Sequence, residues 1–122
     1  MKKQASYPEQ IERLNLDLAA TTRDLAEARE QIDVIEHLIT LEVLNARAAD
    51  GKPAYSNETA RAAAIKSRLL EHEQHRQLRR HLLDLEQAKA EALARLERAR
   101  GEFKLHLLDR QTAIASQMTM AS

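Results

Sequence analysis

The sequence predicts an all-α protein, a long antiparallel two-helix hairpin of the coiled-coil type. Ala, Leu, Arg, Glu and Lys make up 71 of the 122 residues, and this composition is typical of long helices. The two glycines and two prolines leave little material for the turns of a many-stranded sheet. Apolar residues also recur with a helical period through the N-terminal half. Because 122 residues suffice for one small domain, we expect a single helical-hairpin domain over residues 1–122.

The first helix is expected over residues 8–50. Apolar residues recur at sevens from Ile11, and eight of the ten positions of this stripe are apolar, which is the pattern of a left-handed coiled coil. Ser6 and Glu9 have the spacing of a capping box, although Pro8 makes Tyr7 an alternative cap. The residues expected in the seam of the first helix are Ile11, Leu18, Leu25, Ile32 and Ile35. The apolar residues beside the stripe, Val34, Leu38, Leu41, Val43 and Leu44, predict more than one packing partner.

The loop is expected over residues 51–56 and the second helix over about 57–116. Gly51 suits the left-handed conformation that ends a helix, and Pro53 prevents the helix from continuing. Ser56 or Asn57 can cap the second helix. An eleven-residue repeat predicts that the second helix is nearly straight, with Gly101 as either a hinge or a tolerated exposed glycine. The repeat consists of Leu85, Leu96 and Leu107, together with Ala92, Phe103 and Ile114. Leu85, Leu96 and Phe103 are the residues expected opposite the seam of the first helix.

The charges favour antiparallel pairing of the two helices. Residues 9–50 carry ten acids and four bases, whereas residues 57–122 carry nine acids and twelve bases. A short loop forces consecutive helices to lie antiparallel. Folding about Pro53 places Leu38 opposite Arg68 and Glu27 opposite Arg79, with His72 and His75 between them. The acids expected along this strip are Glu27, Glu30, Asp33 and Glu36.

The unequal helix lengths predict self-association. The second helix extends beyond the first after about residue 99, and two helices cannot cover all the apolar faces of the first. We therefore expect a homodimer in which two hairpins form a four-helix bundle. The alternative is a chain that turns at Gly101, so that a third helix folds back. The residues expected at the oligomer contact are Phe103, Leu105, Leu107, Leu108 and Ile114.

A basic stripe on the second helix is the main candidate binding feature. Its residues are Arg61, Arg68, His72, His75, Arg76, Arg79 and Arg80. We favour ion pairs with the acidic first helix, and the alternatives are nucleic-acid phosphates or a protein partner. The balance of 19 bases and 19 acids, and the absence of aromatic residues from the stripe, argue against nucleic acid. His72 and His75 have a spacing that can chelate a metal, but two further ligands would have to come from elsewhere, so we expect a solvated helix face and no metal.

Several function classes are disfavoured. The absence of cysteine excludes disulfide scaffolds, cysteine zinc sites and thiol catalysis. No glycine-rich phosphate loop, nucleophile elbow or carboxylate pair is visible, so we expect neither an enzyme nor a cofactor. The start, Met1-Lys2-Lys3, is not followed by an apolar segment, and no apolar run approaches the ~18 residues that cross a bilayer. We therefore expect a soluble, cytoplasmic protein that does not engage a membrane.

The loop carries a family resemblance. The run from Gly51 to Glu58, GKPAYSNE, is followed by Arg61 and by a long helix that bears Phe103. It resembles a loose group of small helical-hairpin (coiled-coil) proteins of bacterial, phage and mobile-element genomes, over roughly residues 45–105. The resemblance implies the hairpin and turn chemistry in the loop, and it implies no catalytic or binding residues. The sequence thus predicts a non-enzymatic coiled-coil scaffold or protein-interaction module that self-associates. An accessory nucleic-acid-binding protein is the alternative.

Overall fold

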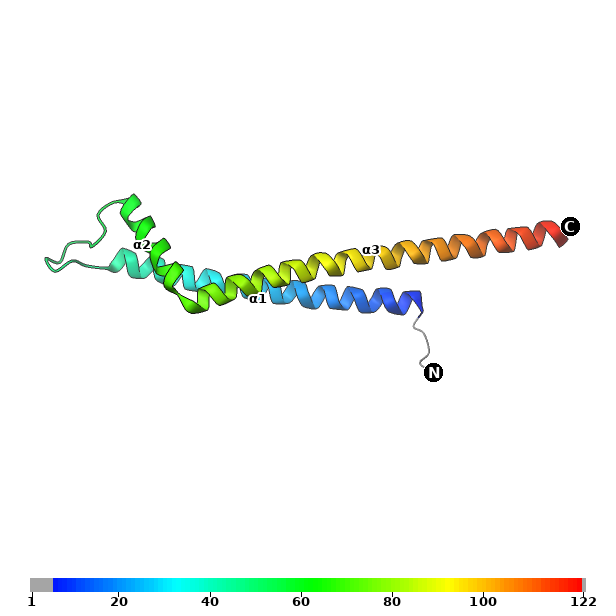
Figure 1. Cartoon of the computed structure of the whole chain (residues 1–122), viewed down its shortest axis with the longest axis horizontal. Helices are drawn as coiled ribbons and strands as arrows, with labels where there is room; N and C mark the ends of the chain where they lie inside the picture. The colour runs from blue at the N-terminus through cyan, green and yellow to red at the C-terminus, as the bar shows by residue number, and fades with distance from the viewer. Residues whose placement is uncertain (1–5, 122) are drawn as a thin grey trace. The chain divides into compact units, whose positions relative to one another are not determined.

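The computed structural model describes residues 6–121, and this part of the chain is all-helical apart from the loops. The helices are α1 (Tyr7–Asn45), α2 (Glu58–Glu71) and α3 (Glu73–Ala121), in that order (Figure 1). The all-α prediction is therefore confirmed. The chain divides into two compact units. The loop unit comprises residues 23–86, and the end unit comprises residues 6–22 and 87–121 as far as the structure describes them.

Helix α1 begins one residue earlier and ends five residues earlier than expected. The backbone N–H of Glu9 donates to Oγ of Ser6 over 3.3 Å, so Ser6 caps the helix. The expected end at residue 50 is wrong because residues 46–48 pair with the returning chain instead. Ala54 donates its N–H to the carbonyl of Ala46 over 2.9 Å, and Arg47 and Pro53 form an antiparallel bridge between these residues.

The non-helical connection therefore covers residues 46–57 rather than 51–56. Gly51 has a φ of 79°, a conformation that glycine adopts without the steric cost that a Cβ imposes. The backbone N–H of Lys52 donates to Oδ1 of Asp50 over 3.0 Å and closes this turn. Asn57 caps α2, because its Oδ1 accepts the N–H of Ala60 over 2.8 Å. The cap at Asn57 and the left-handed conformation of Gly51 are confirmed, but Gly51 lies six residues beyond Asn45 and does not end the first helix as expected.

The prediction of one continuous helix over residues 57–116 is wrong. The chain leaves the helical conformation at His72, which separates α2 from α3. From Glu73, α3 continues through Gly101 to Ala121. Gly101 is thus an ordinary helical residue. The chain does not turn there, so the alternative in which a third helix folds back at Gly101 is wrong. The α3 side chains are described as far as Met120.

The buried seam of each unit follows a heptad. In the loop unit, α1 buries Leu25, Ala28, Ile32, Ile39 and Val43. In the end unit, α3 buries Leu96 and Ala99, while Ile11 and Leu18 of α1 are half-buried. Ile35, Leu85 and Phe103, also expected in the seam, are half-buried. The inward positions of α3 recur at alternating intervals of three and four residues. These positions are His75, Leu78, Leu82, Leu85, Lys89, Ala92, Leu96, Ala99 and Phe103. The predicted eleven-residue period is therefore wrong for this stretch, because a helix that packs along a heptad partner must follow a 3.5-residue period.

The helices of the loop unit run antiparallel, in a register about one turn away from the expected one. Arg68 lies 3.4 Å from Glu42, rather than beside Leu38. The expected register took Pro53 as the midpoint of the hairpin. The Arg68–Glu42 pair instead places the midpoint at Tyr55.

Candidate interaction surfaces

His72 forms the junction between α2 and α3. Its backbone is extended, with φ −82° and ψ 106°. Its N–H donates to the carbonyl of Leu69 and its own carbonyl accepts the N–H of Arg76, both over 3.1 Å. Its imidazole Nδ1 accepts the backbone N–H of His75 over 3.1 Å. His72 therefore ends α2 and caps α3, which satisfies a helix-end donor that would otherwise lack a partner.

His75 connects α3 to α1. Its side chain is buried, and Nε2 lies 3.0 Å from Oε1 of Glu36. The contact is a hydrogen bond when the imidazole is neutral and an ion pair when it is protonated. No buried side-chain N or O atom of the described residues lacks a partner, so this polar pair is accommodated in the seam. Glu36 is one of the acids expected to face the basic stripe.

The remaining residues of the basic stripe divide into paired and unpaired side chains. Arg68 pairs with Glu42 across the helices, and Arg76 pairs with Glu73 on its own helix. The guanidinium of Arg76, by hydrogen bonding and by its charge, lowers the pKa of the Glu73 carboxyl below its usual value. Arg61 is half-buried. Arg79 and Arg80 are exposed and form no ion pair among the described residues. The predicted pairing with the acidic helix is thus confirmed for Arg68 and His75 and does not extend to Arg79 and Arg80.

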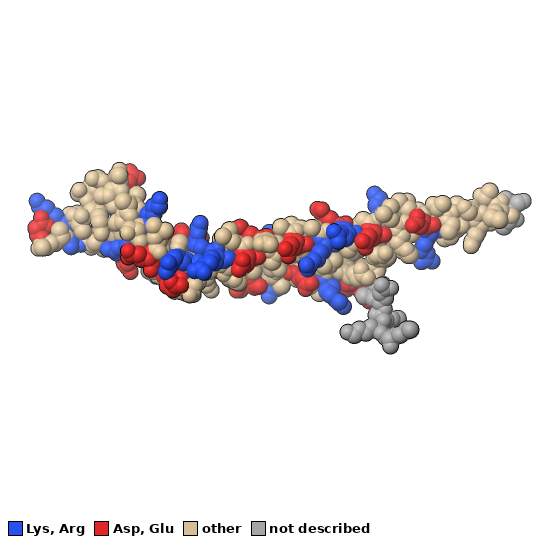
Figure 2. Space-filling view, in the orientation of Figure 1, with Lys and Arg blue, Asp and Glu red and all other residues tan. Residues whose placement is uncertain are grey.

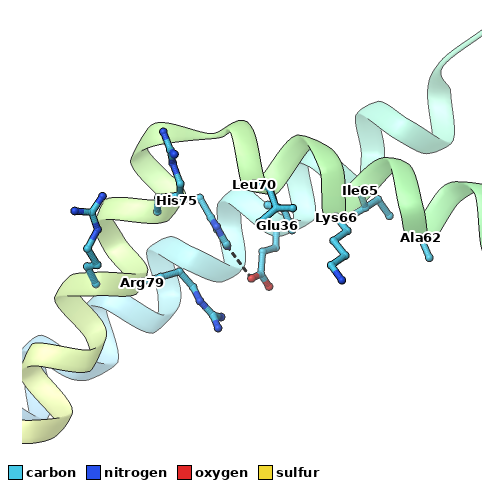
Figure 3. A pocket seen from close by; sticks show the side chains of 10 residues that line it. Glu36, Ala62, Ile65, Lys66, Leu70, His75 and Arg79 are labelled. Carbon is cyan, nitrogen blue, oxygen red and sulfur yellow. Dashed lines mark hydrogen bonds and ion pairs between the residues drawn. The ribbon is translucent and has the colours of Figure 1, made fainter.

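An open groove of about 710 Å³ lies in the loop unit beside the His75–Glu36 pair. We call it the cationic groove. Figure 3 shows this pair between Lys66 of α2 and Arg79 of α3. The cationic residues that line the groove are Lys66, Arg76, Arg79 and Arg80. The apolar residues that line it are Ala62, Ile65, Leu69 and Leu70. The groove therefore combines an apolar lining with four positive charges, of which, in the described chain, only Arg76 has an ion-pair partner.

A second hollowed surface lies on the other flank of α1 in the same unit, and we call it the acidic face. It consists of two adjoining hollows of about 420 and 500 Å³, which share Ile35, Leu38 and Gln74. Its acids are Glu27, Glu30, Glu42 and Glu71, and its base is Arg68. Val34 and Leu38 are 53% and 54% exposed there. Two residues along an α-helix correspond to a rotation of about 200°, so Leu38 projects away from Glu36 of the cationic groove.

The C-terminal part of α3 presents apolar side chains to solvent. In the end unit, the ring of Tyr7 lies 5.7 Å from that of Phe103 and 5.4 Å from that of His106. Phe103, expected at the oligomer contact, is therefore half-buried within the hairpin. Every described side chain over residues 104–120 is exposed. This stretch includes the other four residues expected at that contact, Leu105, Leu107, Leu108 and Ile114.

Elsewhere the surface is mixed in charge, and Figure 2 shows acidic and basic side chains interspersed on the face that it draws. Within residues 6–121, no group of three or more His, Asp or Glu side chains converges in a way that could hold a metal ion. The His72–His75 pair instead uses Nδ1 and Nε2 for the contacts described above. Among the described helices, none is both long and apolar enough to span a membrane.

Comparison of the chain with protein-family models, with curated proteins and with solved structures gives no significant match. The resemblance of the loop to small helical-hairpin proteins therefore stays a prediction.

Sequence reasoning missed two features of these surfaces. It placed His72 and His75 on one continuous helical face, whereas His72 caps a helix and His75 is buried. It also missed the apolar residues that α2 contributes to the cationic groove. The groove depends on the break between α2 and α3 at His72, which the sequence did not predict. The available signal for the helix break was the position of His72, three residues before the His75 N–H that it caps. This signal is weak, because Ser, Thr, Asp and Asn are the usual N-cap residues.

Proposed function

We propose that the chain is a non-enzymatic, cytoplasmic coiled-coil scaffold that self-associates through the C-terminal part of α3. The observation that carries this proposal is the run of exposed large apolar side chains after Phe103, among them Leu107, Ile114 and Met118, which are 44%, 52% and 70% exposed. Clusters of exposed apolar residues mark interaction sites.

The spacing of this run suits a helical partner. Leu107, Ile114 and Met118 are separated by seven and four residues, as in a coiled-coil seam. A second copy of the end unit offers the same residues, so a two-fold contact would be self-complementary. This contact by itself joins two single helices, so the four-helix bundle expected from the sequence forms only where the C-terminal part of α3 also packs against the hairpin of the second copy.

The test is the mass of the chain in dilute solution, measured by light scattering. We expect a dimer for the natural sequence and a monomer of 13.9 kDa for the double substitution L107Q/I114Q. The control L16Q alters a leucine that is 64% exposed on α1 and should remain dimeric. Circular dichroism checks that all three chains are equally helical. A natural chain that is monomeric, or an L107Q/I114Q chain that remains dimeric, would contradict the proposal.

The alternative is an accessory nucleic-acid-binding protein. It is supported by the exposed Arg79 and Arg80 and by Lys66 beside them. Binding of labelled single- and double-stranded DNA and RNA, measured by anisotropy over a salt series, tests it. Affinity that falls linearly with the logarithm of salt concentration, and that R79A/R80A weakens, would favour this alternative. A natural chain that binds none of the probes at low salt would exclude it.

A further inference from the structure

We propose that the cationic groove of one copy of this chain docks the acidic face of the loop unit of a second copy. The inference rests on the proposed self-association, but it uses residues of the loop unit rather than of the C-terminal part of α3. It therefore adds a second, electrostatic contact with its own specificity.

Charge complementarity identifies the occupant of the groove. The cationic groove has four basic side chains, of which Glu73 engages Arg76. Its single carboxylate, Glu36, is already engaged by His75. The acidic face has four carboxylates against the single guanidinium of Arg68, which Glu42 already engages. Each surface thus carries an excess of one sign that the other neutralises, and such complementarity determines register and partner choice.

The apolar residues of the two surfaces also match. Leu70 of the groove is 63% exposed. Val34 and Leu38 lie four residues apart on α1, so they project side by side from one helical face. A helix that inserts residues at this spacing into an apolar groove is a common mode of recognition. A nucleic acid would meet the cations but would leave Leu70 and Ile65 without an apolar partner, which favours the protein occupant.

The placement of the two surfaces determines how copies connect. Glu36 and Leu38 project to nearly opposite sides of α1. Glu36 lines the cationic groove, whereas Leu38 lines the acidic face. Such a contact is heterologous, because one surface of the first copy meets a different surface of the second. Heterologous contacts either close into a ring or extend into a chain. We therefore expect species larger than a dimer as the protein concentration rises.

The test uses charge reversal in the full chain, with sedimentation velocity over a range of protein concentrations. The substitutions R79E/R80E invert part of the groove, and E27K/E30K invert part of the acidic face. The matched control for R79E/R80E is R95E/R98E, which makes the same change of net charge at exposed positions of α3 outside both surfaces. We expect either reversal alone to weaken growth beyond the dimer about tenfold or more, and the control to have less than about a twofold effect.

An equimolar mixture of the two reversed chains is the decisive arm. In the mixture, the natural groove of one variant meets the natural acidic face of the other, and the reversed groove meets the reversed acidic face, so association should recover to within about twofold of the natural chain. Failure to recover would overturn the proposal, as would equal effects of R79E/R80E and R95E/R98E. An R79E/R80E chain that associates normally but no longer binds labelled RNA would overturn it and assign the groove to nucleic acid.

The α3 contact is tested separately from this one. In the L107Q/I114Q background, the docking proposal predicts weak, concentration-dependent association that disappears with R79E/R80E and at about 1 M salt, where the Debye length is ~3 Å. An L107Q/I114Q chain that stays monomeric at every concentration would overturn the docking proposal and leave the α3 contact standing.

Discussion

Replacement of Leu25 by alanine tests whether the seam of α1 stabilises the fold. Leu25 is 2% exposed, and the substitution removes three carbon atoms from this site. Burial contributes about 0.8 kcal/mol per methylene, which gives about 2.4 kcal/mol, and the residual cavity increases the loss to about 3 kcal/mol. With an unfolding entropy of ~2.1 cal/mol/K per residue, this loss lowers the melting temperature of a chain of this length by about 12 °C.

The assay is thermal unfolding followed by circular dichroism at one fixed protein concentration, because association contributes to apparent stability. Leu16 provides the matched control, since it lies on the same helix and is 64% exposed. We expect the L16A chain to melt within about 2 °C of the natural one, which corresponds to a change within about 0.5 kcal/mol. Equal shifts for L25A and L16A would refute the assignment of the heptad to a buried seam.

Substitution of the two glycines by alanine should change stability in opposite directions. G101A should stabilise the chain by about 1 kcal/mol, because Gly101 is helical with open space around it. G51A should destabilise the chain by about 1 kcal/mol, because Gly51 has a positive φ. Urea unfolding measures both, and a G101A chain that loses stability would restore the hinge interpretation. In the same unfolding experiment, the H72A chain should lose about 1 kcal/mol of stability because the His75 N–H loses its acceptor, whereas H72N keeps a capping oxygen and should lose less; equal losses for the two chains would contradict the cap. The lowered pKa of Glu73 means that its pairing with Arg76 contributes stability above the unfolded-state pKa, and that this contribution disappears as pH falls through the lower folded-state pKa. NMR titration should find the Glu73 pKa raised in R76A, and an unchanged pKa would refute the pairing.

The helical part of the fold could be predicted from the sequence because its signals are local and repeated. The heptad from Ile11 and the cap at Asn57 each depend on residues a few positions apart. The break at His72 could not be predicted in the same way. No proline or glycine interrupts the sequence there, and residues around it have ordinary helix propensity. The break becomes visible only when the His72 imidazole is seen to accept a backbone N–H in place of a helical carbonyl.

The candidate surfaces were only partly predictable for a related reason. Helical periodicity groups Arg68, His75 and Arg79 on one face, but it does not tell which of them meets an acid of the other helix. Which arginine meets an acid depends on the register of the two helices, and the observed register differs from the expected one by about one turn. The exposed apolar residues after Phe103 could be predicted, because their exposure follows from helix length alone.

The antiparallel arrangement also suggests an order in which the contacts form. Arg68 and Glu42 are 26 residues apart in sequence and His75 and Glu36 are 39 apart, whereas Tyr7 and Phe103 are in contact but 96 residues apart. The entropic cost of loop closure rises with the length of the loop, so contacts near the turn form at the lowest cost. Each closed pair then shortens the loop that the next pair must close. We therefore expect the hairpin to close outward from the Asp50–Lys52 turn, and the aromatic contact of Tyr7 to be the last formed and the first to open.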